Sequence, residues 1–502
     1  MISNEILAEV VLENRRDFEN LLQKILSEKN LEEKYLLAKQ AVRFAVNNNT
    51  GYYSSDILEK FFLEVAQSHV CEGISDEYQQ SSFLHVMTEC YETGGHTRVV
   101  ERWMEFGKEE QLHSLFFTEE AACISERLKN AVTGETYIML DSMTDLEKGL
   151  ELRKIASEYE FVILHIHMHD TVPLIAFGTK KFKRPVIFFN HADHRFWVGV
   201  SIADAIAELR MWGQELTLNK RGGCRSRILN VPPNPYPVSE RNKFLAKQKL
   251  GFPTDGKILL TMGSINKYLP MEKYNFLDVI EKLLRKNEDV ILIGIGLTFQ
   301  KYPEWKKASE KLNGRILALG LKKSHELPDY IEAADCGIDS FPMSGGLALM
   351  EYISRNCPVV SLKCPTDQFD YVSKSSMFCA DEEVLLQKVE LILNDEVQAL
   401  EFAKDQQKWL AHENNWETWK QNLNEVLEFA GKEHEIRDFK SVCAEKVSDL
   451  DMYLVLGRVK KIILIPFLFG LYRVRVDKKR RYRWLFAKNN RSHGGIEEVD
   501  ND

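Results

Sequence analysis

The sequence has no long apolar run, no cysteine pair at C-x-x-C spacing and no excess of positive charge. Because no stretch of about 18 consecutive apolar residues occurs, we do not expect a membrane-spanning helix. The N-terminal stretch MISNEILAEVVLENRRDFENLL carries carboxylates among its apolar residues and lacks the apolar core of a secretory signal. The nine cysteines are odd in number, which favours reduced thiols over a disulfide framework. We therefore expect a cytoplasmic protein.

The composition excludes several classes of protein. The net charge of −9 argues against nucleic acid as a partner, although charge is unevenly distributed along the chain. Hydrophobic residues make up 44% and charged residues 28% of the sequence, as in a globular protein rather than a disordered or fibrous one. A chain of 502 residues is long enough for two or three domains with full-sized cores.

Hydrophobic periodicity divides the chain into four parts. Helical spacing predicts a helical N-terminal segment, 1–78. Short apolar runs alternate with helical stretches on both sides of the proline-rich segment VPPNPYPVSE, which indicates two parallel sheets joined by a linker. We expect an α/β protein with two doubly wound Rossmann-like domains, 79–235 and 236–430, that face a cleft. Residues 431–502 form a basic and aromatic C-terminal extension.

The predicted strands place unusual residues at their carboxyl ends, where ligands bind in open α/β sheets. The strands are FLHVMTE, HSLFFTE, YIMLD, FVILHIHM and PVIFFNH in the first domain, and KILLTMGS, VILIGIG, RILALG, CGIDSFP and PVVSL in the second. The residues at the strand ends of the first domain are Gly94, Gly95, His96, His169, Asp170, Asn190, His191 and Asp193. Those of the second domain are Gly263, Ser264, Lys267, Gly294, Gly296, Ser344, Gly345 and Gly346.

The segment DSFPMSGGLALMEYISRNCPVVSL has the pattern of a strand, a Gly-Gly turn, a helix and a second strand. A helix that begins near Leu347 directs unpaired N–H groups and the positive end of its dipole above Gly345 and Gly346, which suits phosphate. Glu351 lies little more than a turn into this helix, and one carboxylate can accept from both vicinal hydroxyls of a ribose. Lys267 follows the first strand of this domain and can face the same diphosphate. The alternative is an ordinary turn beside a solvent-facing glutamate.

In motif order over residues 82–375, these features resemble the GT-B glycosyltransferases, especially the glycogen-synthase-like branch that uses nucleotide diphosphate sugars. The resemblance is strongest over LGLKKSHELPDYIEAADCGIDSFPMSGGLALMEYISRNCPVVSL. It implies that the segment from Leu319 borders the nucleobase and that Glu351 binds ribose. It further implies that Lys267 neutralises the leaving diphosphate. The residues that hold the diphosphate would be Gly263, Ser264, Ser344, Gly345, Gly346 and Leu347.

The first domain extends the resemblance, with one departure in the second domain. GGHTRVVERW, which contains Gly94, Gly95 and His96, resembles the family's glycine-rich loop under acceptor and donor. HMHD resembles its strand-end histidine, here His169. Retaining members usually carry a second glutamate eight residues before the ribose glutamate, where this sequence has Met343. The stereochemistry of transfer is therefore left open.

The resemblance implies glycosyl transfer without a metal, because the helix dipole and Lys267 replace the cation. We expect no metal and no cofactor beyond the donor, for which a UDP-sugar is a candidate. A general base is needed if the reaction inverts, and the candidates are His169, Asp170, His191, Asp193 and His194. The D-x-D pair Asp449 and Asp451 lies in a helical-looking segment and is interpreted as surface.

A histidine-rich pattern supports a different chemistry. HIHMHD and NHADH carry histidines at spacings typical of metal ligands, so a metal-dependent hydrolase is an alternative. The simpler interpretation is that His165, His167 and His169 alternate along one strand, with the first two held within the sheet.

Residues 458–488 combine an apolar centre with eleven Lys or Arg residues and one acid, Asp477. This pattern suits an interfacial segment on an anionic membrane surface, and a helix packed across the domains is the alternative. We expect a metal-independent hexosyltransferase that moves a sugar to a glycan, lipid-linked or protein hydroxyl acceptor, in cell-surface polysaccharide or glycoconjugate synthesis. The alternatives are a protein O- or N-glycosyltransferase and an inactive GT-B adaptor or chaperone subunit.

Overall fold

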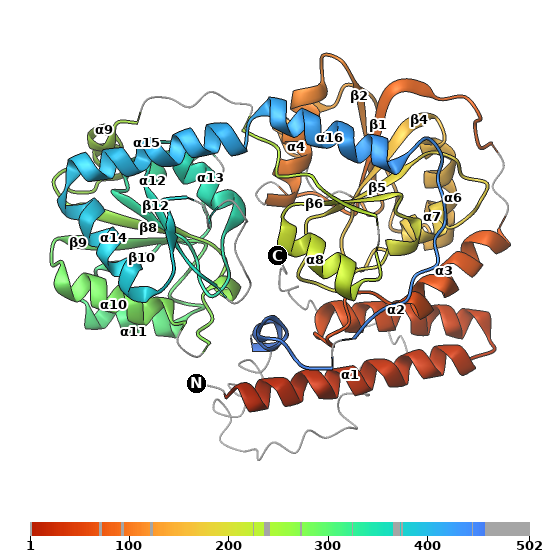
Figure 1. The fold of residues 1–502 in the computed structure, drawn as a ribbon, viewed down its shortest axis with the longest axis horizontal. Coiled ribbons are helices and arrows are strands. Elements are labelled where there is room, and N and C mark those ends of the chain that lie inside the picture. Colours follow the sequence, from red (N-terminus) through yellow and green to blue (C-terminus); the bar gives the residue numbers. More distant parts are fainter. Residues whose placement is uncertain are drawn as a thin grey trace.

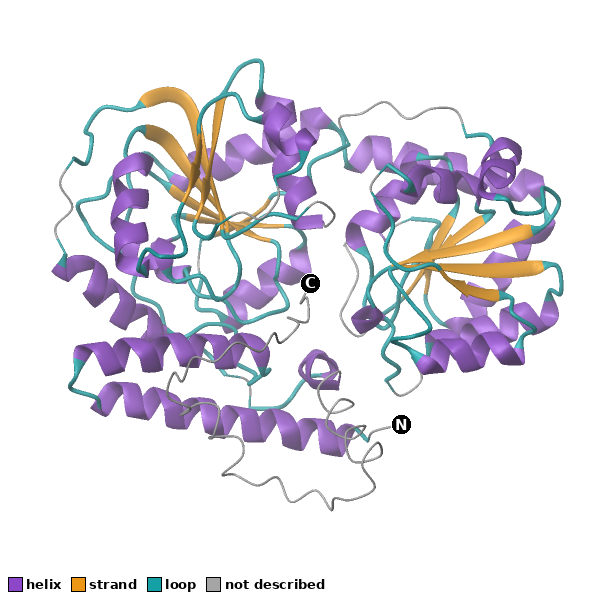
Figure 2. Ribbon diagram, turned by 180° about the vertical axis from the view of Figure 1, so that it is seen from behind, coloured by secondary structure: helices purple, strands orange, loops and turns teal. Residues whose placement is uncertain are grey.

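Two parallel sheets, each covered by helices on both faces, form the body of the protein (Figures 1 and 2). The computed structural model describes residues 3–69, 73–91, 95–120, 124–223, 225–234, 241–271, 274–323, 325–364, 372, 375–443 and 445–456. Most strand residues are buried, as expected for parallel strands that helices cover from both sides. The predicted fold class is confirmed.

The first sheet has seven parallel strands in the order β3-β2-β1-β4-β5-β6-β7. They are β1 Gln79–Met87, β2 Leu112–Phe117, β3 Thr136–Ile138, β4 Tyr159–His165, β5 Val186–Asn190, β6 Ala205–Glu208 and β7 Ser226–Ile228. The connecting elements are α4 Gly95–Gly107, α5 Glu126–Ala131, α6 Asp145–Ala156, α7 Val172–Phe177, η1 Val200–Ile202 and α8 Met211–Lys220. The predicted strand FVILHIHM ends at His165, so the alternation expected for His167 and His169 is wrong: both follow the strand.

The second sheet has six parallel strands in the order β10-β9-β8-β11-β12-β13. They are β8 Lys257–Met262, β9 Val290–Ile295, β10 Ile316–Ala318, β11 Cys336–Ile338, β12 Val359–Leu362 and β13 Phe378–Cys379. The connecting elements are α9 Lys243–Leu250, η2 Ile265–Lys267, α10 Phe276–Lys286, α11 Pro303–Lys311, α12 Leu327–Ala333, α13 Gly346–Ser354 and α14 Glu382–Asn394.

After α14 the chain crosses back to the first domain. Helix α15 (Glu396–Glu413) lies over the second domain and α16 (Trp416–Ala430) over the first (Figure 1). The ring of Trp419 contacts that of Trp103 edge-on, with centroids 5.3 Å apart, and its Nε1 donates to the carbonyl of Asn230 at 2.9 Å. The aromatic contact therefore holds α16 on the first domain.

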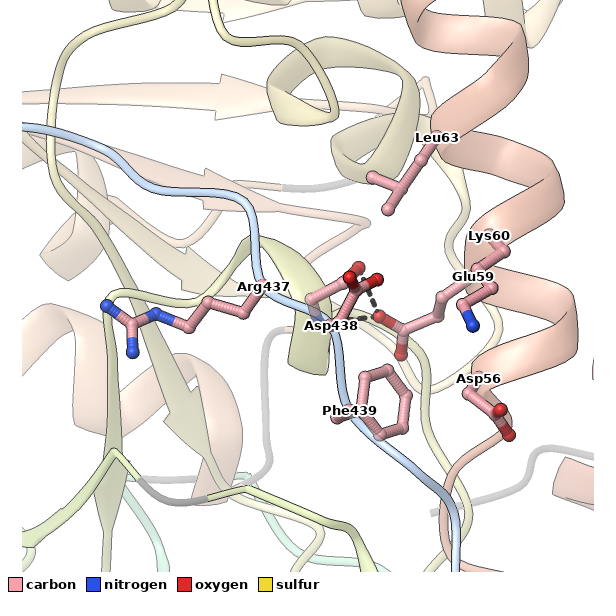
Figure 3. A pocket seen from close by; sticks show the side chains of 8 residues that line it. Asp56, Glu59, Lys60, Leu63, Arg437, Asp438 and Phe439 are labelled. Carbon is pink, nitrogen blue, oxygen red and sulfur yellow. Dashed lines mark hydrogen bonds between the residues drawn. The ribbon is translucent and has the colours of Figure 1, made fainter.

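The helical N-terminal segment packs against the first domain. Its helices are α1 Asn4–Ser27, α2 Leu31–Asn47 and α3 Asp56–Ser68, and their apolar faces share one core with the first sheet. In α3 the buried carboxylate of Glu59 accepts hydrogen bonds from the N–H groups of Gly199, Val200 and Ser201 at 2.7–3.0 Å. Figure 3 shows Glu59 pointing from α3 toward the chain that carries Asp438. This carboxylate fixes α3 to the turn at η1.

Residues 431–443 and 445–456 run back along the first domain toward the second. His434 contacts Asp204 through Nδ1 at 2.8 Å, and Ser441 bonds the carboxylate of Asp56. Asp451 is fully buried and accepts from Tyr53 at 2.8 Å and Asn49 at 3.0 Å, so its interpretation as a surface residue is wrong. Its hydrogen bonds make it a structural residue that ties this segment to the N-terminal helices.

The segment ends in an apolar cluster beside the second domain, named here the terminal cluster. Its buried members are Leu7, Val11, Met271, Met452, Tyr453, Val455 and Leu456, and Met343 packs against them. Within the described ranges, no helix is long and apolar enough to cross a membrane. The basic segment 458–488 lies outside the described residues.

Candidate functional site

Each sheet reverses its strand order beside its first strand. β1 lies between β2 and β4, and β8 lies between β9 and β11. In open parallel sheets, ligands bind beyond the carboxyl ends of the strands at such a reversal. The loops after β1, β4, β8 and β11 therefore define the candidate site.

Asp339 follows β11 and organises the turn that leads into α13. Its carboxylate accepts from the N–H of Gly345 at 2.8 Å and from the hydroxyls of Ser344 at 2.6 Å and Ser361 at 2.7 Å. Burial raises the pKa of Asp339, against the effect of these hydrogen bonds. A buried carboxylate with several donors fixes a backbone strongly, so the turn 340–345 is held in one shape.

The turn leaves little room for a side chain at its glycines. A Cβ on Gly345 would lie 2.7 Å from Oδ1 of Asp339, and Gly346 has a φ of +26°. Helix α13 begins at Gly346, and no described residue accepts from the N–H of Gly346 or Leu347. These groups and the helix dipole make the space above the turn favourable for an anion.

Lys267 lies at the same turn, in the short helix η2 after β8. Its Nζ is 3.4 Å from the carbonyl oxygen of Ser344, and its own carbonyl accepts from the N–H of Met343 at 3.3 Å. Burial lowers the pKa of Lys267, and the nearby Asp339 carboxylate opposes this shift. The predicted neighbours Lys267 and Ser344 are thus brought together, while the side chain of Ser264 is exposed.

The carboxyl ends of β8, β9 and β10 approach one another closely. A Cβ on Gly296, which has a φ of +89°, would lie 2.5 Å from the carbonyl oxygen of Gly263. The N–H of Leu319 donates to the carbonyl of Gly294 at 2.9 Å, which places Leu319 next to this strand end. The predicted residue Leu319 therefore lies beside the end of β9, and Gly263 lies beside Lys267, with a Cβ at Gly263 3.3 Å from Cδ of Lys267.

The first domain meets this turn at the start of α4. A Cβ on Gly95 would lie 2.8 Å from Cδ1 of Leu347, so the two helix starts are in contact across the domains. His96 follows, and its ring centroid lies 4.1 Å from that of His191 at the end of β5. Gly94 lies outside the described residues.

A cluster of histidines lies beside this contact. The ring of His167 is 5.8 Å from that of His96 and 6.0 Å from that of His169. Burial lowers the pKa of His191 to about 3, and it also lowers the pKa values of His96 and His169. An uncharged imidazole both donates and accepts a hydrogen bond.

Three further histidines form a row across the sheet. His85 on β1 bonds His165 on β4 through Nδ1 at 3.1 Å and His113 on β2 through Nε2 at 2.9 Å. Burial lowers the pKa of His165 to about 3 and that of His113 to about 4. This row lies inside the sheet, as was predicted for His165.

The two predicted aspartates are engaged by neighbours. Asp170 accepts from the hydroxyls of Thr88 at 2.7 Å and Thr118 at 2.5 Å. Asp193 accepts from Nε of Arg210 at 2.6 Å and from its Nη2 at 3.0 Å. Burial acts to raise the pKa of Asp193, but the guanidinium outweighs it and holds the pKa below its ordinary value. Because both carboxylates already accept hydrogen bonds from neighbouring side chains, this geometry suits orientation of those side chains better than proton transfer.

Glu208, which sequence reasoning did not identify, lies next to Asp193 at the end of β6. Its buried carboxylate accepts from the hydroxyl of Thr217 at 2.5 Å and from Nδ2 of Asn190 at 2.9 Å. Burial and the Asp193 carboxylate raise the pKa of Glu208 to about 7, despite these hydrogen bonds. The position at the end of a strand is the signal, but β6 was not predicted from its short sequence AIAE.

Glu351 contacts the first domain. Its Oε1 is 2.8 Å from Nη2 of Arg102 and 3.2 Å from Nη1 of Arg98, both on α4. Both arginines lie in the predicted glycine-rich loop segment GGHTRVVERW, but no function was predicted for them. Their i, i+4 spacing, which places both on one helix face at the carboxyl end of the first sheet, is the signal. Over the described part of the chain, no group of three or more histidine, cysteine or acidic side chains is arranged to hold a metal ion.

No family model and no curated protein sequence matches the chain. Solved structures do match. A complex of Anabaena HepE with UDP and glucose is 14% identical with a TM-score of 0.54, and the match covers 69% of this chain and 99% of HepE. A Rickettsia africae glycosyltransferase is 12% identical with a TM-score of 0.53, over 71% of this chain and all of that one.

The O-GlcNAc transferase of Thermobaculum terrenum matches a larger part of the chain. It is 13% identical with a TM-score of 0.51, over 84% of this chain and 79% of the transferase. Sequence identities this low establish a shared architecture. With two parallel sheets, a helical crossover and a site at both strand-order reversals, the chain has the GT-B fold of these glycosyltransferases.

Proposed function

We propose that the protein transfers a glycosyl group from a nucleoside diphosphate sugar to a hydroxyl acceptor without a metal. The observation that carries this proposal is the convergence of Lys267, the Asp339-organised turn and the start of α13 at one reversal of the second sheet. A cation, free N–H groups and a helix dipole suit a diphosphate, and Glu351 lies one turn further along for a ribose.

The chemistry needs positive charge where the nucleoside diphosphate departs. Lys267 and the N-terminus of α13 supply it, and because both are fixed before reaction, little reorganisation is needed. The developing charge on the leaving phosphate is thereby stabilised. No further cofactor is required for this step.

The histidine cluster is proposed to contact the sugar. Its rings lie beside carboxylates: His167 Nδ1 is 3.6 Å from Glu89, and Asp170 follows His169. Neutral donors among acidic neighbours favour an uncharged hexose over a sugar acid. With Asp170 and Asp193 engaged elsewhere and the pKa of His191 at about 3, these side chains suit hydroxyl binding better than proton abstraction.

A UDP-sugar is the first donor to test, because HepE was solved with UDP and with UDP-glucose. The acceptor is proposed to be a glycan or glycoconjugate of the cell surface. A protein acceptor is the second candidate, because the similarity to the O-GlcNAc transferase extends over 84% of the chain.

A thermal-shift panel of UDP, GDP, ADP, CDP, dTDP and their hexose derivatives tests the donor site. A ligand at 100 times its Kd stabilises the folded state by about 2.7 kcal/mol. We expect one nucleotide to raise the Tm of the parent and to do so less in Lys267→Ala and Glu351→Ala. Lys306→Ala, an exposed lysine on α11, is the matched control and should respond like the parent.

Measuring the release of free nucleotide from a nucleotide sugar distinguishes a transferase from an inactive adaptor. Slow hydrolysis of one nucleotide sugar by the parent, lost in Lys267→Ala, would support catalysis. Nucleotide binding without any turnover, in the presence of glycan and peptide acceptors, would instead favour the adaptor. No response to any nucleotide in a folded protein would refute the proposal.

Attachment to an anionic membrane through residues 458–488 is also proposed, from the charge of that segment. The test is sedimentation with phosphatidylglycerol vesicles, compared with phosphatidylcholine vesicles. We expect the full chain to sediment with the anionic vesicles only, and a chain shortened after Leu456 to remain in solution. Equal sedimentation of the two chains would contradict the proposal.

A further inference from the structure

The carboxylate of Glu351 is shared between the domains. It belongs to α13 of the second domain, yet its Oε1 lies 2.8 Å from Arg102 and 3.2 Å from Arg98 of the first. The three side chains are largely shielded, with exposed fractions of 16% for Glu351, 5% for Arg102 and 19% for Arg98. Desolvation makes such an ion pair costly, so stability alone is a weak reason for it.

The geometry leaves one carboxylate oxygen available. Both guanidinium groups contact Oε1 of Glu351, while Oε2 has no hydrogen-bond partner among the described residues. A ribose hydroxyl can therefore donate to Oε2 without displacing either arginine.

Arg102 also contacts the connection between the two sheets. Its Nη1 donates to the carbonyl of Pro232 at 3.4 Å, at the start of the proline-rich linker. Pro233 and Asn234 line a small pocket together with Arg102 and Glu351. Arg102 thus contacts both the linker and the second domain, and separation of the domains would break its contact with Glu351.

We propose that Arg102 and Arg98 are positioning residues of the donor site: they orient Glu351 for the ribose, so that the ribose contact is complete only when the domains are closed. This inference rests on the proposed function, because it takes Glu351 as the ribose-binding carboxylate. Linkage then requires that nucleotide binding and domain closure favour each other.

The preference for ribose over deoxyribose is the readout. Calorimetry gives the Kd of UDP and of 2′-deoxy-UDP for the full chain, or of the corresponding pair with the base that the thermal-shift panel selects. A lost hydrogen bond to a charged group weakens binding by about tenfold or more. We expect the parent to prefer the ribonucleotide by about tenfold, and Arg102→Gln and Glu351→Gln to reduce this preference to about threefold or less.

Three comparisons distinguish positioning from a structural effect. Arg102→Lys keeps the charge without the planar fork and should retain an intermediate preference. Arg98→Gln, at a more exposed position, provides a second test if Arg102→Gln folds poorly. Arg127→Gln is the matched control. Arg127 lies on α5, is 53% exposed and pairs at 4.0 Å with Glu101, which is on α4 beside Arg102. This variant should keep the preference of the parent.

The outcomes separate this inference from the function on which it rests. If Arg102→Gln weakens both nucleotides equally and the tenfold ratio persists, the arginine is structural and the inference is overturned. Adding Arg102→Gln to Glu351→Gln should change the ratio no further, and a further loss would also overturn it. If the parent binds no nucleotide, the proposed function fails. If the parent binds nucleotides without preferring ribose, only the ribose contact proposed for Glu351 and its two arginines is overturned.

Discussion

Replacement of Glu208 by glutamine is expected to stabilise the protein above neutral pH. The folded state raises the pKa of Glu208 from 4.5 to about 7, so its stabilising contribution is fully present below pH 4.5 and is lost as the pH rises through about 7. One pKa unit corresponds to about 1.4 kcal/mol, which gives a loss of about 3 kcal/mol at high pH. Glutamine is neutral at every pH and escapes this loss. Its amide can donate to the Thr217 hydroxyl, which accepts as well as donates.

The assay is thermal unfolding of the parent and Glu208→Gln at pH 5 and pH 8.5. For a domain of about 150–250 residues, 1 kcal/mol shifts Tm by about 2–4 °C. The variant should therefore exceed the parent by only about 1 kcal/mol, or roughly 2–4 °C, at pH 5, and by roughly 6–12 °C at pH 8.5. Glu425→Gln, at an exposed position on α16, controls for removal of one surface charge. An equal difference between variant and parent at both pH values would refute the assigned pKa shift.

Three further substitutions test the site and its frame. Gly345→Ala places a Cβ 2.7 Å from the Asp339 carboxylate, so nucleotide Kd measured by calorimetry should rise at least tenfold, and an unchanged Kd would contradict the close packing of the turn. Asp193→Ala breaks a buried ion pair and should lower stability by about 3–5 kcal/mol in thermal unfolding, whereas a loss under 1 kcal/mol would show that the pair contributes little. Trp419→Ala removes the contact of α16 with the first domain, and should cost about 3–5 kcal/mol and expose α16 to limited proteolysis. Unchanged protection of α16 would place its main anchor elsewhere.

The architecture was predictable because its strands are buried on both faces. Such strands appear in the sequence as continuous apolar runs, and ten runs were identified at positions where the structure has strands. β6, β7 and β13 were missed. Their sequences AIAE, SRI and FC are short, and two of the three contain a charged residue. In each case the neighbouring strand, and not local composition, determines the pairing.

The site was predictable as a set of strand ends but not as a set of contacts. Lys267 and Ser344 meet because β8 and β11 are neighbours in the sheet, which strand order implies. The pair of Asp193 and Arg210 was missed because Arg210 follows β6, which was not recognised. The contact of Arg102 with Glu351 depends on the relative orientation of the two domains, which no local sequence pattern predicts. The parts assigned to these residues in binding and catalysis stay predictions.

The terminal cluster has a consequence for the order in which the protein is made. Met343, in the turn before α13, packs against this cluster, whose buried members come from α1, from Met271 and from residues 452–456. On the ribosome, α1 emerges first, the turn follows more than 300 residues later, and the segment that covers both comes about a hundred residues after that. The flank of the turn therefore stays uncovered during synthesis until almost all of the two-domain body has emerged. A nascent chain would acquire a fully packed turn before α13 only at the end of translation of this region.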